Sequence, residues 1–142
     1  MSRRWHVIAA FLVLAVALGV TVGCSSLGAD PLNGTQWRLT GWSISSIDPA
    51  SVTITMKFAD GQVSGNSGVN GYGGPYTAGP GGSLALGALA MTEMAGPEPA
   101  MRAESAYQTL LAQVRSYKLA DGKLTLFDKG GNESLIFEPA AK

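Results

Sequence analysis

The sequence predicts an α+β fold in which one α-helix packs on a curved, barrel-like antiparallel β-sheet. Short runs of alternating apolar and polar residues recur along the chain, and Asp-Gly or Gly-Gly turns separate them. A single segment with helical periodicity interrupts these runs. Alternation with a period of two indicates strands that are buried on one face and exposed on the other. A helix inserted once among such strands is typical of the α+β class.

The clearest strand is expected at residues 52–58, where every second side chain is apolar: Val52, Ile54, Met56 and Phe58. An earlier strand is expected at 36–42, with Trp37 in a structural role on its inner face. The Asp60-Gly61 pair predicts a hairpin turn into a short strand at 62–64. Further strands are expected around the apolar pairs that follow: Leu84 and Leu86, Tyr117 and Leu119, Leu124 and Leu126, and Leu135 and Phe137. The last three runs, joined by turns at 120–122 and 129–132, predict an antiparallel meander.

The helix is expected at residues 100–115. Pro97 and Pro99 mark its start, because proline fits the first helical turn, where its missing N–H has no intrahelical partner. The acidic Glu98 suits the positive end of the helix dipole, and Arg115 suits the negative end. One apolar stripe runs along the segment: Ala103, Tyr107, Leu110, Leu111 and Val114. This stripe predicts the face that packs on the sheet.

Residues 64–76 are rich in glycine, asparagine and tyrosine and contain no charged residue. Glycine and asparagine tolerate positive φ, so the stretch predicts a sharply bent loop in which Gly65, Gly68 and Gly71 satisfy backbone geometry. The alternative is a contact surface for a partner or a small ligand. Its candidate residues are Asn66, Asn70, Tyr72 and Tyr76. A phosphate-binding loop is excluded, because the Gly-x-Gly-x-x-Gly spacing would need glycine at position 76 and no Lys-Ser/Thr pair follows.

The amino terminus resembles a bacterial lipoprotein signal peptide, residues 1–23. Arg3 and Arg4 precede an uncharged apolar run at 7–22, which is shorter than the ~20 residues of a spanning helix. Gly23-Cys24 closes the run. The resemblance implies cleavage between Gly23 and Cys24, diacylglycerol on the Cys24 sulfur and acyl chains such as palmitate on the new amino terminus. A plain secretory signal and an uncleaved anchor helix are the alternatives. Residues 24–32 are expected to be a tether, and 33–138 the folded domain.

Loss of residues 1–23 removes His6, the only histidine, and lipidation occupies the only cysteine. The remaining chain lacks the Ser-His-Asp triad, a cysteine nucleophile and zinc sites built on His or Cys. We therefore expect no enzymatic activity, metal or cofactor. A formal net charge of +0 gives no basic field for nucleic acid. A hydrolase using carboxylates alone is a minor alternative.

Other candidate side chains are given structural interpretations. Among the acidic residues Glu93, Glu98 and Glu104, the last is expected to accept hydrogen bonds from loop or helix-start amides. Residues 128–133 lack the spacing of a calcium-binding loop and are expected to form a hairpin turn. Met91, Met94 and Met101 are expected to fill the core rather than to form a docking site.

Five segments, in this order, resemble the META domain family of HslJ-like heat-shock lipoproteins: Trp37-Arg38-Leu39, Val63 to Tyr76, Met91 to Pro97, Met101 to Tyr107, and Leu124-Thr125-Leu126. The match runs from about residue 32 to 138. It implies an envelope protein, linked in some members to stress response or drug tolerance, and no agreed catalytic residues. Many members carry cysteine where this chain has Val69 and Gly96. If these two form a bridge in the family, this chain lacks a link that contributes ~2–4 kcal/mol.

Together these observations predict a monomeric, lipid-anchored, extracytoplasmic protein at the cell membrane or outer membrane. Its expected role is stress-related and non-enzymatic, through binding or stabilisation at the envelope. The alternative is a binding module that contacts an envelope protein or a small ligand through loop 64–76.

Overall fold

The computed structural model describes residues 28–141 of the chain. The predicted signal peptide and Cys24 lie outside these residues. The described elements follow in this order: β1 Thr35–Trp42, β2 Thr55–Ala59, β3 Gln62–Asn66, β4 Gly71–Ala78, β5 Leu84–Leu86, β6 Ala90–Met91, α1 Glu98–Gln113, β7 Val114–Ala120, β8 Lys123–Asp128 and β9 Glu133–Pro139. Short 3-10 helices lie at Pro49–Ser51 and Pro80–Gly82. Among the described helices, none combines the length and the apolar character needed to cross a bilayer.

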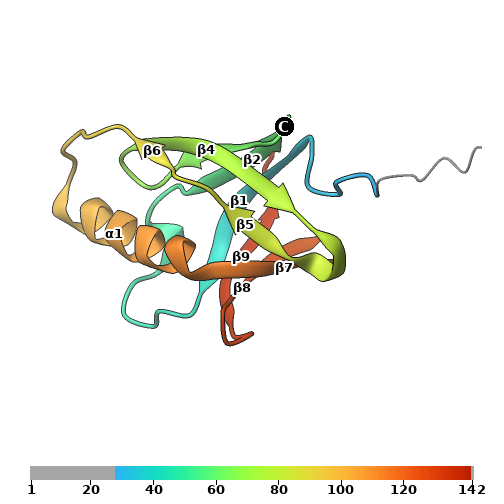
Figure 1. The fold of residues 1–142 in the computed structure, drawn as a ribbon. Coiled ribbons are helices and arrows are strands. Elements are labelled where there is room, and N and C mark those ends of the chain that lie inside the picture. The colour runs from blue at the N-terminus through green and yellow to red at the C-terminus, as the bar shows by residue number, and fades with distance from the viewer. Residues whose placement is uncertain (1–27, 142) are drawn as a thin grey trace, which may run out of the picture.

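The strands form one antiparallel sheet that curves into a nearly closed barrel. The order across the sheet is β5-β4-β3-β2-β1-β9-β8-β7, and the short β6 pairs with β4. A bridge between Ser83, beside β5, and Ser116 of β7 brings the two ends of this order together. Figure 1 shows the helix α1 beside one end of the barrel, from which the chain runs directly into β7. The predicted class, a curved antiparallel sheet with one packed helix, is confirmed.

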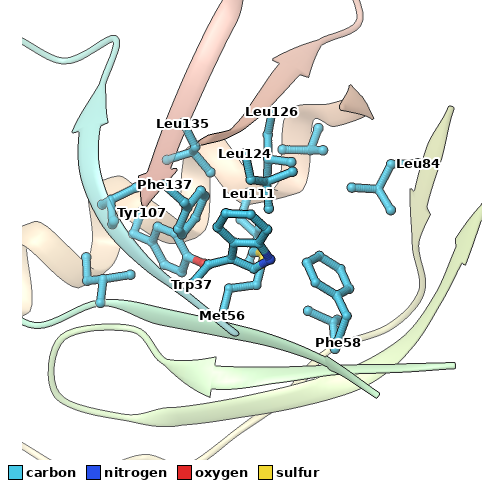
Figure 2. Packing of buried hydrophobic residues seen from close by; sticks show 14 of the residues in the cluster. Trp37, Met56, Phe58, Leu84, Tyr107, Leu111, Leu124, Leu126, Leu135 and Phe137 are labelled. Carbon is cyan, nitrogen blue, oxygen red and sulfur yellow. The ribbon is translucent and has the colours of Figure 1, made fainter. Parts of the chain in front are cut away.

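The inward-facing side chains of the strands fill the barrel (Figure 2). The residues from β2, β8 and β9 that are at most 1% exposed are Met56, Phe58, Leu124, Leu126, Leu135 and Phe137. Trp37 is 6% exposed, and its indole Nε1 donates to Thr35 Oγ1 at 2.7 Å, so the ring is buried while its polar atom is paired. The helix adds Tyr107, Leu110 and Leu111 to this core, as its apolar stripe predicts.

The hairpin turns at Asp60-Gly61 and Asp121-Gly122 are both present. Asp60 has φ 52° and Gly61 75°, and Asp121 has φ 53° and Gly122 71°. Two successive residues of positive φ form the turn whose twist matches that of the flanking strands. The Asp-Gly dipeptide is therefore sufficient to fix these two connections.

Several boundaries differ from the sequence prediction. The helix begins and ends two residues earlier than expected, at Glu98 and Gln113, so Arg115 lies in β7 instead of the last helical turn. Its Nη1 nevertheless donates to the carbonyls of Ala112 and Val114. Strand β2 begins at Thr55, because Ile54 makes only an isolated bridge with Ser67.

A bulge in β1 decides the position of Trp42. The pairing of β1 with β9 shifts by one residue between Leu39 and Gly41. The shift turns Trp42 toward the core, where it is half-buried, and its Nε1 donates to the carbonyl of Ile47 at 2.8 Å.

The glycine-rich stretch is a β-hairpin, so the prediction of a bent loop over 64–76 is wrong for most of its length. It comprises the end of β3, a turn at 67–70 and most of β4. Within it only Gly68 has a positive φ, of 123°. Gly65 serves a different purpose: a Cβ there would lie 2.0 Å from the carbonyl oxygen of Thr55. The glycine allows strands to approach closely, a need that sequence cannot distinguish from a need for bending.

The folded unit begins before the expected boundary at residue 33. Leu32 is 0% exposed and belongs to the core. Asp30 accepts a hydrogen bond from the hydroxyl of Tyr76 and, through Oδ1, one from the amide of Leu32 at 2.9 Å. Residues 30–32, assigned to the tether from sequence, are therefore part of the domain.

Gly65→Ala is predicted to lower the free energy of unfolding by about 3 kcal/mol or more, because backbone must move to make room for the methyl group. Gly71→Ala is the matched control in the same hairpin, since its Cβ would meet only Gly65 O at 3.8 Å. We expect this variant to be neutral or slightly more stable. Urea denaturation measures both, and equal stability of the two variants would contradict the close-approach explanation.

Candidate functional site

Glu104, on α1, is a buried carboxylate that receives three hydrogen bonds from the β3–β4 turn. Its Oε1 accepts from the Ser67 hydroxyl and from the amide of Asn70 at 2.8 Å. Its Oε2 accepts from Asn70 Nδ2, also at 2.8 Å. Glu104 is 3% exposed and Ser67 is 0% exposed. The carboxylate therefore joins the helix to the turn, and the predicted structural role of Glu104 matches this geometry.

Asn70 extends the connection to residues 92–94, the segment between β6 and α1. Its Oδ1 accepts from Thr92 Oγ1 at 2.9 Å and from the amide of Met94 at 2.7 Å. Its Nδ2 also donates to the carbonyl of Met94 at 3.2 Å. One buried amide side chain thus links the helix carboxylate to the segment that leads into the helix.

The hydrogen bonds decide the charge state of Glu104. Burial alone would raise the pKa of this carboxyl, but the side chains of Ser67 and Asn70 and the amides of Asn70 and Val69 stabilise the carboxylate. Their combined effect lowers the pKa below the ordinary 4.5. Glu104 is therefore an anion whose lone pairs are already used in the fold.

Two tyrosines form the next polar contact under the helix. The hydroxyls of Tyr72 and Tyr107 lie 2.8 Å apart, and the Tyr72 hydroxyl donates to the carbonyl of Thr55 at 2.9 Å. Burial raises the pKa of both phenols well above 10. Both remain neutral at ordinary pH and act as hydrogen-bonding groups rather than as bases.

The four side chains proposed from sequence as a contact surface do not form one. Asn70, Tyr72 and Tyr76 are between 4% and 6% exposed. Asn66 is half-buried, and its Oδ1 accepts from the amide of Gly68 within the turn. The hydroxyl of Tyr76 donates to the carboxylate of Asp30 and makes no contact with Glu104. These residues were expected on a loop surface, but the hairpin directs three of them inward.

A cavity of about 350 Å³ opens between α1 and the strands β4 to β6. Leu86, Leu89, Met91, Leu111, Ala112 and Val114 give it apolar walls. Its polar lining comes from Ser67, Tyr72, Tyr107, Gln108 and Arg115. Among the described residues that line it, none is acidic. We call this the helix cavity.

Among the residues that line the helix cavity, only Tyr72 was a candidate binding residue from the sequence. Gln108 and Ala112 lie four residues apart on α1, at the edge of the apolar stripe, and so share a helix face with it. This spacing is a signal that could have indicated the helix side of the cavity. The opposing wall, Leu86 and Leu89, carries no comparable signal, because its place depends on the path of the chain between β5 and β6.

The other acidic residues considered from the sequence lie away from Glu104, at the surface. Glu93 and Glu98 are exposed, and Glu98 pairs with Arg102 on the helix surface at 3.4 Å. Within residues 28–141, no three His, Cys, Asp or Glu side chains are grouped so as to hold a metal ion. Asp128 accepts hydrogen bonds from Gly130 and Asn132 in the β8–β9 turn, which is the hairpin expected at 128–133.

The profile of the META domain family matches residues 30–141. The chain belongs to the META domain family. An NMR structure of a protein from Burkholderia xenovorans superposes with a TM-score of 0.65 and 26% sequence identity, over 78% of this chain and 85% of that one. A second NMR structure gives a TM-score of 0.54 at 19% identity, over 76% and 91% of the two chains, and shows the likeness of fold alone. No curated protein matches the chain.

The two positions at which many META domains carry cysteine are in contact. A Cβ built on Gly96 would lie 3.4 Å from Val69 Cβ and 2.7 Å from Val69 Cγ2. The Cβ separation in disulfides is about 3.5–4.5 Å. Valine and glycine therefore fill, without a covalent bond, the space of a disulfide beside the Glu104 turn.

Glu104→Gln is predicted to lower the free energy of unfolding at neutral pH by about 3 kcal/mol, because an amide NH2 would meet donors where a carboxylate oxygen now accepts. The folded pKa of Glu104 lies below its unfolded value. The ionised Glu104 therefore contributes fully to the free energy of unfolding above about pH 4.5, and this contribution is lost as the pH falls through the folded pKa.

Chemical denaturation between pH 3 and pH 7 tests this dependence. The difference in the free energy of unfolding between wild type and Glu104→Gln should become smaller as the pH falls. Glu98→Gln, on the exposed face of the same helix, is the control and should follow wild type. A constant difference across the pH range would contradict the role given to the carboxylate.

The double variant Val69→Cys, Gly96→Cys is predicted to form a disulfide under oxidising conditions. Bridging should raise the free energy of unfolding by about 2–4 kcal/mol relative to the same variant under reductant. The single variant Val69→Cys cannot form this bridge and should show no such redox dependence. With Cys24→Ser in every variant, free thiols in the oxidised double variant would show that the two positions are not held as close as the structure indicates.

Proposed function

We propose that this META domain protein is a lipid-anchored, extracytoplasmic binding module that has no catalytic activity. We further propose that it binds a small, largely apolar molecule in the helix cavity. The observation that carries the proposal is the cavity itself, with apolar walls on both sides and a few polar groups at defined places. Such a cavity is the usual form of a small-molecule site.

The polar groups of the helix cavity differ in their availability. The hydroxyls of Tyr72 and Tyr107 are hydrogen-bonded to each other inside the core. Gln108 and Arg115 are exposed. Arg115 donates through Nη1 to the carbonyls at the end of α1, which leaves its other N–H groups directed to their surroundings. A ligand with an apolar body and one polar or anionic end fits this arrangement.

The chemistry of the described side chains supports binding over catalysis. The one deeply buried acid, Glu104, is fully hydrogen-bonded in a structural position. A carboxylate hydrolase needs a second acid near the first, and the lining of the helix cavity provides none among the described residues. The sequence from residue 25 onward also contains no histidine or cysteine.

The proposal of a lipid anchor is supported by the sequence around Cys24. The domain begins at about Asp30, so a modified Cys24 would leave a tether of only a few residues between lipid and barrel. The membrane would be the cell membrane, or the outer membrane where the host has one, and a stress-related role follows from the family resemblance. Metabolic labelling with a fatty-acid analogue tests the anchor: wild type should incorporate label, and Cys24→Ala should not.

Binding is tested with an apolar fluorescent probe such as N-phenyl-1-naphthylamine. Ala112→Trp places a large ring in the mouth of the helix cavity and should weaken binding by about ten-fold or more, a loss of ~1.4 kcal/mol. Gln113→Trp, one residue further along the exposed helix surface and outside the lining, should bind as wild type does. Circular dichroism confirms that both variants fold. Equal probe binding by the two variants would exclude the helix cavity as the site.

A further inference from the structure

We propose that Met91, Met94 and Met101 form a binding site for a soft monovalent metal ion, Cu(I) or Ag(I). The three methionines line one hollow of about 410 Å³ beside the start of α1. This proposal does not rest on the small-molecule binding proposed above, although Met91 and Gln108 also line the helix cavity. We call it the methionine hollow.

These methionines are more exposed than core residues would be. The sequence predicts all three in the core, and this prediction is wrong for Met94, which is 57% exposed. Met91 and Met101 are half-buried. By contrast, Met56 of strand β2 is 1% exposed and packs in the barrel. Core filling accounts for Met56, and Met91 packs against the edge of the core, but burial does not explain the exposed thioether of Met94.

The backbone holds each of the three in place. Met91 lies in β6 and pairs with Tyr72 of β4. Met94 is bonded through its amide and its carbonyl to the Asn70 side chain, at 2.7 and 3.2 Å. Met101 lies in the first turns of α1, where its amide donates to Pro97 O. Because Glu104 joins Asn70 to α1, the three attachment points belong to one connected unit, while the unbranched side chains can adjust their sulfur atoms to an ion.

The chemistry of thioethers defines the ion. Methionine sulfur is a neutral, soft ligand that selects Cu(I)-like ions over Mg²⁺, Ca²⁺ or Mn²⁺, which prefer oxygen. Residues 28–141 contain no cysteine or histidine, so thioethers are their only soft donors. The carboxylate of Glu93 borders the same hollow and offsets the positive charge of a bound ion.

The rest of the lining favours an ion over an apolar protein segment. Asn70, Thr92, Glu93 and Gln108 are polar, and Ala95 is the one further apolar side chain among the described lining residues. A docking groove for an apolar helix or strand would need wide aromatic or branched aliphatic walls. Here three methionines share the lining with polar side chains, which suits a small cation.

The test uses the full-length protein in detergent, labelled with ¹³C at the methionine methyl groups, and titrated with Ag(I). We expect the methyl resonances of Met91, Met94 and Met101 to shift until one ion is bound per chain, and that of Met56 to stay unchanged. Because an unmodified Cys24 sulfur would also bind silver, each protein is measured in a Cys24→Ser form as well.

Matched variants decide the result. Met94→Leu and Met101→Leu should each weaken Ag(I) binding by about ten-fold or more, whereas Met56→Leu should leave it unchanged. Zn²⁺ should produce no methyl shifts. Equal Ag(I) affinity of wild type and the Met91→Leu, Met94→Leu, Met101→Leu triple variant would overturn the proposal. Methyl shifts that appear with an apolar peptide but not with Ag(I) would overturn it in favour of protein docking.

Discussion

The buried carboxylate of Glu104 is the interaction on which the helix side of this domain depends. A carboxylate inside a protein is strongly destabilising unless hydrogen bonds replace its lost hydration. Here Ser67 and Asn70 supply three such bonds from the β3–β4 turn. The side chain of Asn70 also forms hydrogen bonds with residues 92–94. The helix, the turn and the segment before the helix are therefore fixed relative to one another. The methionine hollow is lined by residues of these elements, and the helix cavity shares α1 and Ser67 with them, so the same carboxylate helps to position one wall of each.

Glycine makes this arrangement possible by its small size more than by its flexibility. The Tyr72 hydroxyl reaches the carbonyl of Thr55 across the intervening strand because Gly65 has no side chain there. A Cβ on Gly74 would lie 2.5 Å from the carbonyl of Ala88, so this glycine lets the chain before β6 lie against β4. Close approach of backbone segments brings Tyr72 under the helix and β6 alongside the sheet. The glycines of the hairpin thus shape the cavity.

Noncovalent contacts hold Val69 and Gly96 against each other. Val69 and Gly96 lie against each other at the positions where many relatives carry cysteine. Both are close in sequence to residues that hydrogen bonds connect to Glu104, since Asn70 follows Val69 and Met94 lies two residues before Gly96. A cross-link here would tie the same two segments that Asn70 joins by hydrogen bonds. In this chain their separation is therefore set by the buried polar contacts and by the fit of valine against glycine.

The sequence by itself determined the features that depend on local periodicity and local backbone preference. Alternation placed most of the strands but not β4 or β6, Asp-Gly pairs fixed two hairpin turns, and the apolar stripe of the helix identified Tyr107 and Leu111 as core residues. It could not determine whether a glycine serves bending or close approach, because both use the same residue type. It placed Asn70 and Tyr72 on a surface and Met94 in the core, since composition gives polarity but not direction. Only the tertiary structure decided these directions, because they follow from which distant strands and carbonyls lie opposite each residue.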